Sequence, residues 1–293
     1  MRIGYPCINR SIGCSANRTF RLASWSPDRF LETVAANLDC LGRILSFNAA
    51  NGIRFFRVTS DLVPFASHPV CDVDWPVRLG EAFATAGALA RTLDVRLAMH
   101  PDQFVVINSP DPGVRERSTA ELVYHARALD ALGCGLEAKI QIHAGGLYGD
   151  RGAALDRFAR TCDTLPDAVR RRLVVENDDR LFPLADGLEI HRRTGLPVLL
   201  DVFHHAVLNR GEPLREALEA AAATWGKSDG APIVDYSSQE PARRPGTHAQ
   251  TLDPADFTRF LAVARPLDPD VMLEIKDKES SALAALALLP RTP

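Results

Sequence analysis

The sequence predicts an α/β protein folded as a single (β/α)8 barrel, or TIM barrel, over residues 1–293. Short runs rich in Ile, Val and Leu alternate with longer amphipathic stretches from one end of the chain to the other, as repeated βα units require. Eight runs pair with eight stretches, and 293 residues is an ordinary length for one such barrel.

The eight apolar runs are expected to form parallel strands at 2–5, 53–58, 95–100, 139–143, 173–176, 197–201, 232–235 and 271–274. Helical periodicity fills the intervals at 27–50, 76–93, 115–132, 152–164, 183–194, 213–223, 254–264 and 280–288. Ser26 and Asp253 each precede a proline, so a capping side chain and a first-turn proline should begin two of these helices.

An open, doubly wound sheet would show the same alternation, because strand order does not reveal whether the sheet closes. The polar residues favour the barrel. A barrel carries its chemistry at the carboxyl ends of its strands, so residues that end several strands point into one bowl.

The composition, with 46% apolar and 24% charged residues, is that of a globular protein. No apolar run is long enough to cross a membrane and the N-terminus lacks a signal-peptide core, so we expect a cytoplasmic protein with no membrane partner. The six scattered cysteines are expected to be reduced. The net charge of −3 gives no general reason to expect a nucleic acid, although four arginines near the N-terminus could form one basic face: Arg10, Arg18, Arg21 and Arg29.

Potential metal ligands end six of the eight predicted strands: His100, His143, Glu176, Asp201, Asp235 and Glu274. Each follows an apolar run that would carry its side chain out of the packed barrel into the mouth. Carboxylates and imidazoles gathered there need a positive charge between them, which a divalent cation supplies.

Three histidines in loops after the strands can reach the same bowl: His68, His204 and His248. His204 has the strongest case, because it stands three residues beyond Asp201. By contrast, His125 and His191 fall within helices and His205 merely adjoins His204, so we expect no metal role for these three.

A donor set of His and carboxylate without cysteine suits Zn²⁺, Mn²⁺ or Fe. Glu176 could bridge two ions about 3.5–4 Å apart, as in centres that activate water for phosphodiester cleavage. Barrel isomerases of sugars use similar ligands, and spacing alone does not separate the two chemistries.

Nine short motifs, in order along the chain, resemble the UV damage endonuclease family: Gly4-Tyr5-Pro6-Cys7, Asn17-Arg18-Thr19, His100-Pro101-Asp102-Gln103, Asn108-Ser109-Pro110, Gln141-Ile142-His143, Glu176-Asn177-Asp178, Asp201-Val202-Phe203-His204-His205, Tyr236-Ser237-Ser238-Gln239 and Glu274-Ile275-Lys276-Asp277-Lys278. The resemblance implies a TIM barrel related to endonuclease IV. It further implies an enzyme that nicks damaged double-stranded DNA immediately 5′ of a cyclobutane dimer, a 6-4 photoproduct or an abasic site, leaving a 3′-hydroxyl and a 5′-phosphate.

The resemblance also implies a three-metal site, often containing Mn²⁺, with no obligate protein partner. Its ligands correspond to His68, His100, His143, Glu176, Asp201, His204, His248 and Glu274. Catalytic roles would fall to Glu176, Asp201, Glu274 and Lys276, and Lys278 would contact a phosphate.

Two pairs of residues match positions at which the family recognises the lesion. Tyr5 and Asn9 correspond to the pocket for the extruded bases, and Gln103 with Phe104 to the pair that fills the gap left in the duplex. The family commonly has Gln-Tyr there, and an aromatic wedge can replace lost stacking without a hydroxyl. The alternative for Phe104 is a buried apolar residue that continues the run 105–107.

The chain departs from the family at Ile233 and Asp235, where a Lys-x-His pair usually lies at the metals. Asp235 can still ligate through oxygen, which should favour Mn²⁺ over Zn²⁺, whereas Ile233 cannot. Two alternatives to the endonuclease therefore stay open. One is a metal-dependent sugar isomerase or epimerase, and the other is a damage-binding barrel with impaired catalysis.

Overall fold

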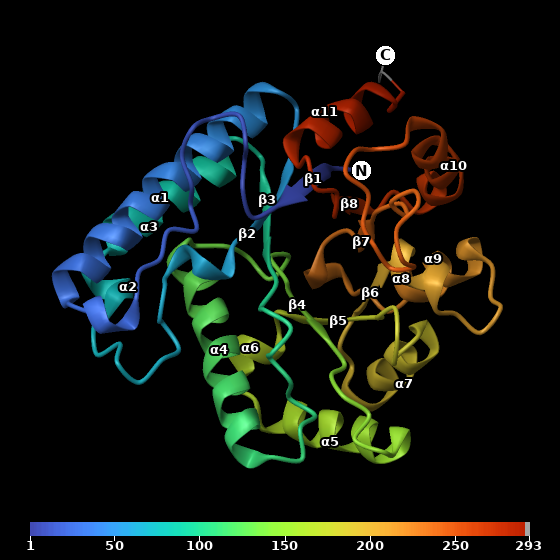
Figure 1. The fold of residues 1–293 in the computed structure, drawn as a ribbon, viewed down its shortest axis with the longest axis horizontal. Coiled ribbons are helices and arrows are strands. Elements are labelled where there is room, and N and C mark those ends of the chain that lie inside the picture. The colour runs from blue at the N-terminus through green and yellow to red at the C-terminus, as the bar shows by residue number, and fades with distance from the viewer. Residues whose placement is uncertain (291–293) are drawn as a thin grey trace.

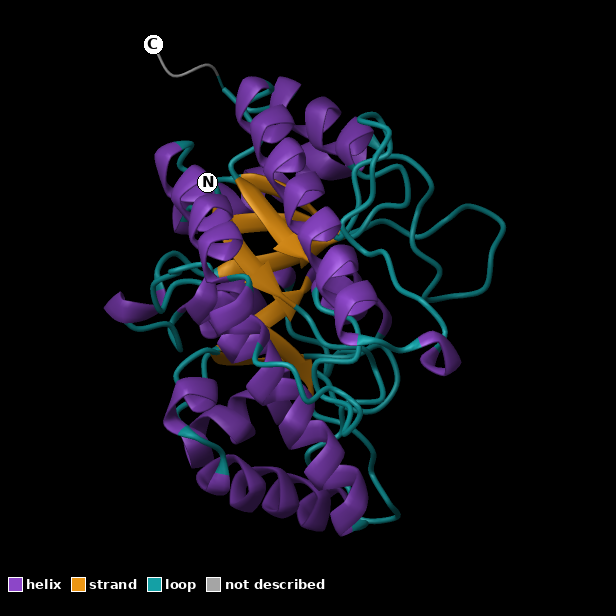
Figure 2. Cartoon of the chain, turned by 90° about the vertical axis from the view of Figure 1, so that its left-hand side faces the viewer, coloured by secondary structure: helices purple, strands orange, loops and turns teal. Residues whose placement is uncertain are grey.

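Eight parallel strands form a closed barrel at the centre of the molecule, in the order β1 to β8 (Figure 1 and Figure 2). The computed structural model describes residues 1–290, so residues 291–293 of the expected domain lie outside the described residues. The strands are β1 Ile3–Pro6, β2 Phe55–Val58, β3 Arg96–Met99, β4 Ile140–His143, β5 Leu173–Glu176, β6 Val198–Asp201, β7 Ile233–Tyr236 and β8 Asp270–Leu273. All eight predicted strands are confirmed, with ends shifted by at most two residues.

The barrel closes through pairing of the first and last strands, in which Ile3 stands opposite Val271 and Gly4 opposite Met272. The open doubly wound alternative is therefore wrong. Each strand pairs in parallel with its neighbours, which brings all eight carboxyl ends to one end of the barrel. Long loops leave the barrel at this end, on the right in Figure 2.

Helices surround the barrel on the outside (Figure 2). They are α1 Pro27–Ala50, α2 Trp75–Arg78, α3 Gly80–Thr92, α4 Pro112–Ala131, α5 Arg151–Thr164, α6 Asp167–Arg170, α7 Leu184–Thr194, α8 Val202–Val207, α9 Leu214–Ala222, α10 Pro254–Ala264 and α11 Glu279–Ala287. Four short 3₁₀ turns join them, η1 Leu22–Ser24, η2 Ser60–Leu62, η3 Lys227–Asp229 and η4 Arg265–Leu267. No described helix meets the length and apolarity needed to traverse a bilayer.

The predicted helix at 76–93 is two helices, because Leu79 leaves the helical region with φ −116° and ψ 18°. Gly80 then begins α3. Glycine is unfavourable in the interior of a helix, so it does not favour one continuous helix across residues 79 and 80. The two predicted caps are confirmed: Ser26 accepts from the amide of Arg29, and Asp253 accepts from the amides that open α10.

An apolar layer fills the interior of the barrel below the mouth, from Phe55, Ala98, Val174, Leu199, Ile233 and Met272. Side chains alternate along a strand, so the next inward position above Phe55 is Arg57 and the next above Ile233 is Asp235. A polar layer therefore lies directly above the apolar one.

A disulfide joins Cys14, in the segment between β1 and α1, to Cys40 in the middle of α1. The expectation that all six cysteines are reduced is wrong for this pair. The fold lays the segment after β1 back along α1, and sequence spacing carries no signal for that approach. The other four cysteines are free thiols: Cys7, Cys71, Cys134 and Cys162.

Candidate metal centre

Glu176, the last residue of β5, lies at the centre of the ligand cluster in the mouth of the barrel. Its Oε2 atom lies 3.3 Å from Nε2 of His100 and 3.6 Å from Nε2 of His143, while Oε1 lies 3.2 Å from Nδ1 of His204. One oxygen of this buried carboxylate thus faces two imidazoles and the other faces a third, which is the arrangement of a bridging metal ligand.

Three overlapping sets of side chains have ligand atoms within 4.8 Å of one another. Glu176 belongs to the first two sets and Asp201 to the last two. The sets are His100, His143 and Glu176; then Glu176, Asp201 and His204; then Asp201, Asp235 and Glu274. All seven residues were predicted from the strand ends and the loop that follows β6.

The local fold explains how His204 joins the cluster. Asp201 caps α8 by accepting a 2.7 Å hydrogen bond from the amide of His204, which brings the imidazole back over the end of β6. His100 is oriented in a similar way, because its Nδ1 atom contacts the carbonyl of Pro101 at 2.6 Å and leaves Nε2 facing Glu176.

Burial alone would raise the pKa of Glu176, but His143, His100 and His204 outweigh it and lower that pKa well below its usual range. Asp201 shows the opposite balance: burial, with Glu176 and Glu274 nearby, raises its pKa despite His204. Glu176 is thus ionised and Asp201 tends to keep a proton, because the side chains alone hold too little positive charge for every carboxylate.

These residues fit a divalent metal. Within the described residues, Oδ2 of Asp201 and Nδ1 of His143 are buried without a hydrogen-bond partner. A buried carboxylate oxygen without a donor is costly, and a cation would both satisfy it and displace the proton that Asp201 retains. The donor set of imidazoles and carboxylates suits Mn²⁺, Zn²⁺ or Fe.

Arg57 and Gln141 also belong to the site, and the sequence analysis missed both. Nη2 of Arg57 donates to both oxygens of Asp235 at 2.7 and 2.6 Å and to Oε1 of Gln141 at 2.8 Å, and Nη1 donates to Glu274. Gln141 in turn donates to Glu176 and, at 2.6 Å, to Asp235. The sequence does contain a sign of both residues, because each is a polar residue inside an otherwise apolar run, as in Phe55-Phe56-Arg57-Val58.

Asp235 and Glu274 keep the Arg57 guanidinium protonated, and Arg57 in turn keeps Glu274 ionised. Burial would lower the pKa of the Arg57 guanidinium, but Asp235 and Glu274 raise it above its usual value. Against the burial effect, Arg57 lowers the pKa of Glu274 to about 2.

A family model described as UV-endonuclease UvdE matches residues 1–291. The chain belongs to the UV damage endonuclease family. A UV DNA damage endonuclease of Clostridium perfringens (strain 13 / Type A) is 34% identical over 288 residues, covering 98% of this chain and 70% of the relative. Its counterpart in Bacillus cereus (strain Q1) is 31% identical and covers 97% and 92% of the two chains. The crystal structure of SacUVDE has 42% identity and a TM-score of 0.95, and covers 99% of this chain and 98% of that one.

More distant solved structures share only the fold with this member of the family. Endonuclease IV from Thermus thermophilus matches with a TM-score of 0.58 at 18% identity, covering 85% of this chain and 92% of its own. A D-psicose 3-epimerase from Clostridium cellulolyticum H10 matches with a TM-score of 0.56 at 14% identity, covering 84% and 91%. Fold likeness at this level does not choose between a nuclease and an epimerase.

The cluster of candidate ligands opens into a cavity of about 440 Å³ at the mouth of the barrel. Lys276 and Lys278, predicted to act near the phosphate, line this cavity. Gln103 and Cys7 line it too, with five of the candidate ligands: His100, His143, Glu176, His204 and Glu274. His248 lines it as well. Its Nδ1 atom contacts the carbonyl of Glu274 at 2.9 Å, so Nε2 is the ring nitrogen left to coordinate a metal ion. The structure thus brings both lysines and His248 to the cluster.

Phe104 is 67% exposed on the loop between β3 and α4, beside Gln103. The alternative of a buried Phe104 is therefore wrong, although Val105 and Ile107 after it are buried. Asn108 braces this loop, because it donates to the carbonyl of Gly146 at 2.8 Å and accepts from the amide of the same residue at 3.1 Å. The neighbouring Gly145 has φ +99°, and a Cβ atom there would lie 2.2 Å from Asn108, so only glycine fits this contact.

Three predicted site residues lie outside the cluster. His68 is exposed on the loop after β2 and belongs to none of the three ligand sets found among the described residues. Tyr5 and Asn9 are buried and bonded to each other, because Asn9 donates to the Tyr5 hydroxyl at 2.7 Å and that hydroxyl donates to Asn48 at 2.6 Å. In this structure the pair is not among the residues lining the cavity, so the lesion-pocket role expected from the family stays a prediction.

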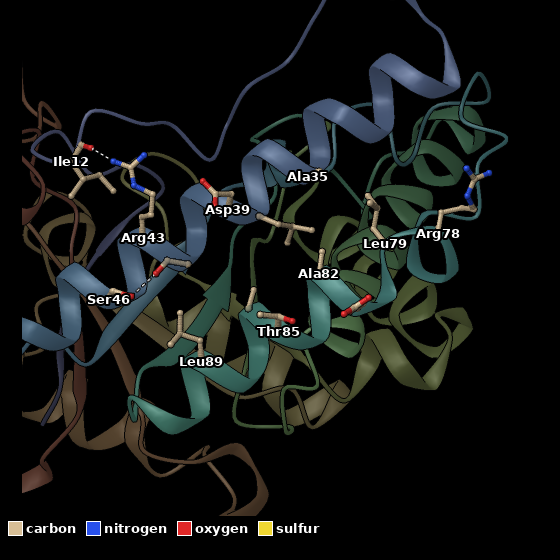
Figure 3. Close-up of a pocket in the computed structure, with 14 residues that line it drawn as sticks. Ile12, Ala35, Asp39, Arg43, Ser46, Arg78, Leu79, Ala82, Thr85 and Leu89 are labelled. Atoms are coloured by element: carbon tan, nitrogen blue, oxygen red, sulfur yellow. Dashed lines mark hydrogen bonds between the residues drawn. The ribbon is translucent and has the colours of Figure 1, made fainter.

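A larger cavity among the described residues lies away from the candidate ligands. A space of about 850 Å³ lies between α1 and α3 on the outside of the barrel, where Arg43 donates to the carbonyl of Ile12 (Figure 3). None of the residues in the three ligand sets lines it. The candidate ligands therefore line the smaller cavity at the mouth and not this one.

Proposed function

We propose that the chain is a metal-dependent endonuclease that nicks damaged double-stranded DNA immediately 5′ of a UV photoproduct or another lesion. The proposal rests on the geometry at Glu176, which lies at the floor of an open cavity. One of its oxygens faces two imidazoles and the other faces a third. Such a centre suits hydrolysis of a phosphodiester, in which attacking and leaving oxygens both carry negative charge.

Divalent ions, two or three in number and most suitably Mn²⁺ with Zn²⁺ as an alternative, would supply charge for activating water and stabilising the leaving oxygen. Glu176 and Asp201 would hold the ion that activates the attacking water. Glu274 and Lys276 face the phosphate, and Lys278 neutralises a second phosphate oxygen. Breaking the bond between phosphorus and the 3′-oxygen leaves a 3′-hydroxyl and a 5′-phosphate.

The duplex would be recognised by insertion of Phe104 and Gln103 into the gap left by the extruded lesion. The exposure of Phe104 supports this role, since an apolar ring held in solvent by a braced loop is suited to stack on a base. A sugar isomerase or epimerase would instead need a closed pocket and has no use for such a ring. A cytoplasmic location and the absence of an obligate protein partner stay predictions.

A nicking assay on a supercoiled plasmid tests the proposal. Ultraviolet-irradiated plasmid should become open-circular in the presence of Mn²⁺, and unirradiated plasmid should stay supercoiled. Damage-specific binding without any nick would favour the barrel with impaired catalysis. Neither binding nor nicking, together with epimerisation of a ketose, would favour the sugar enzyme.

A further inference from the structure

Arg57 is a buried cation within the third ligand set. It contacts two of the three members of that set, Asp235 and Glu274, from its position on β2 across the barrel. Its side chain is 4% exposed and that of Asp235 is fully buried. The apolar layer that contains Ile233 lies directly beneath, so the pair is closed off from solvent on that side.

Asp235 uses both oxygens within this pair. Oδ1 accepts from Arg57 at 2.7 Å, and Oδ2 accepts from Arg57 at 2.6 Å and from Gln141 at 2.6 Å. A metal ion at Asp235 would have to replace these bonds and would leave the guanidinium buried beside a second cation. Asp201 differs, because its Oδ2 has no hydrogen-bond partner among the described residues and it also belongs to the set with Glu176 and His204.

We propose that the Arg57 guanidinium takes the place of the third metal ion, so that this centre binds two divalent ions and Asp235 positions Arg57 instead of ligating metal. The inference rests on the metal centre of the proposed function but not on DNA cleavage. It gives the departure at Asp235 a physical reason: a carboxylate there pairs with Arg57, as a neutral imidazole would not.

Metal content measured by mass spectrometry, after equilibration of the protein with Mn²⁺ and removal of free ions, tests this assignment. Wild type should hold two ions per chain. Asp235→Asn, which keeps the shape and replaces the carboxyl group with an amide, should also hold two, because Asp235 is not a ligand. Three ions in the wild type, or loss of one ion in Asp235→Asn, would overturn the proposal.

Arg57→Met tests the same assignment from the other side. Removing the guanidinium frees Asp235 and Glu274, so the folded variant should bind a third ion, raising the content from two to three. A folded Arg57→Met that stays at two would overturn the proposal. Arg96→Met is the matched control, because Arg96 is a buried arginine paired with Asp270 on another pair of strands, and its loss should leave two ions.

Ion counts do not depend on DNA cleavage. Two ions without damage-specific nicking would refute the proposed function and keep this inference. Three ions together with damage-specific nicking would refute this inference and keep the proposed function. If Arg57→Met does not fold, the wild type and Asp235→Asn still decide the matter.

Discussion

Glu176 faces more of the ligand imidazoles than any other carboxylate of the mouth, with three within 3.6 Å. We expect Glu176→Ala to remove more than one metal ion per chain, because one bridging carboxylate serves two positions. Metal analysis of the folded variant measures this directly. Glu216→Ala, an exposed carboxylate on α9, should lose none. Loss of one ion or fewer from Glu176→Ala would show that Glu176 is not a bridge.

Gln103 and Phe104 are expected to act in recognition and to contribute little to the chemical step. Replacing both with alanine should weaken binding to a damaged duplex by about 2 kcal/mol, the scale of lost base stacking, with metal content unchanged. Phe104→Tyr should bind like the wild type. Binding measured by fluorescence anisotropy provides the test, with the exposed Val77→Ala on α2 as control. Unchanged affinity with slower cleavage would contradict this role.

At the residue scale, sequence reasoning predicted the side chains that cluster at the strand ends, because an apolar run that stops at His or Glu marks the mouth of a barrel. It did not find Arg57 or Gln141, whose partners stand on strands far away in the sequence. It also could not show that Tyr5 and Asn9 satisfy each other below the surface. The partners of Arg57 and Gln141 depend on the register between strands, which the alternation of apolar residues does not fix.

At the element scale, the Cys14–Cys40 disulfide ties the segment after β1 to α1 across a separation of 26 residues. A cross-link of this loop length restricts the unfolded chain and should stabilise the fold by about 3 kcal/mol. Cys40→Ser should therefore lower the free energy of unfolding measured in urea by that amount. The free thiol Cys71 provides the control, since Cys71→Ser should change little.

Two outcomes would contradict the disulfide prediction. One is titration of six thiols in the native protein under non-reducing conditions. The other is coincident unfolding curves for wild type and Cys40→Ser.

The elements themselves were largely predictable. Strand β5 and helices α1 and α10 have the limits that the sequence predicts, because turn residues or capping side chains bound them on each side. The short helices α6 and α8 were not predicted, since four to six residues give too little periodicity to recognise. Asp201 nonetheless caps α8, and that cap places His204 beside Glu176.

For the whole molecule, His125 links stability to pH. It is fully buried in α4, where its Nδ1 atom contacts the carbonyl of Glu121 at 2.8 Å and Nε2 contacts the Ser60 hydroxyl at 3.1 Å. Burial lowers the pKa of His125 from 6.5 to about 4. The folded protein therefore resists protonation of a group that the unfolded chain protonates readily.

Because the folded pKa lies below the unfolded one, this contribution is complete above about pH 6.5 and is lost as pH falls toward 4. At pH 5 the loss should be about 2 kcal/mol relative to pH 7. In urea unfolding at both pH values, His125→Gln should show a smaller difference between the two than wild type, by about that amount. An equal difference would show that His125 does not couple folding to pH.

If metal bound at the barrel mouth cleaves DNA beside a lesion, cleavage must depend on that metal. Single-turnover cleavage of a labelled duplex containing one cyclobutane thymine dimer, with metal-stripped protein and stepwise addition of Mn²⁺, measures this dependence. We predict no cleavage without metal, then cleavage only at the phosphodiester immediately 5′ of the dimer, rising as the centre fills. Cleavage by protein shown to be free of metal, or none by the fully loaded protein, would show that metal at the barrel mouth does not cleave DNA beside the lesion.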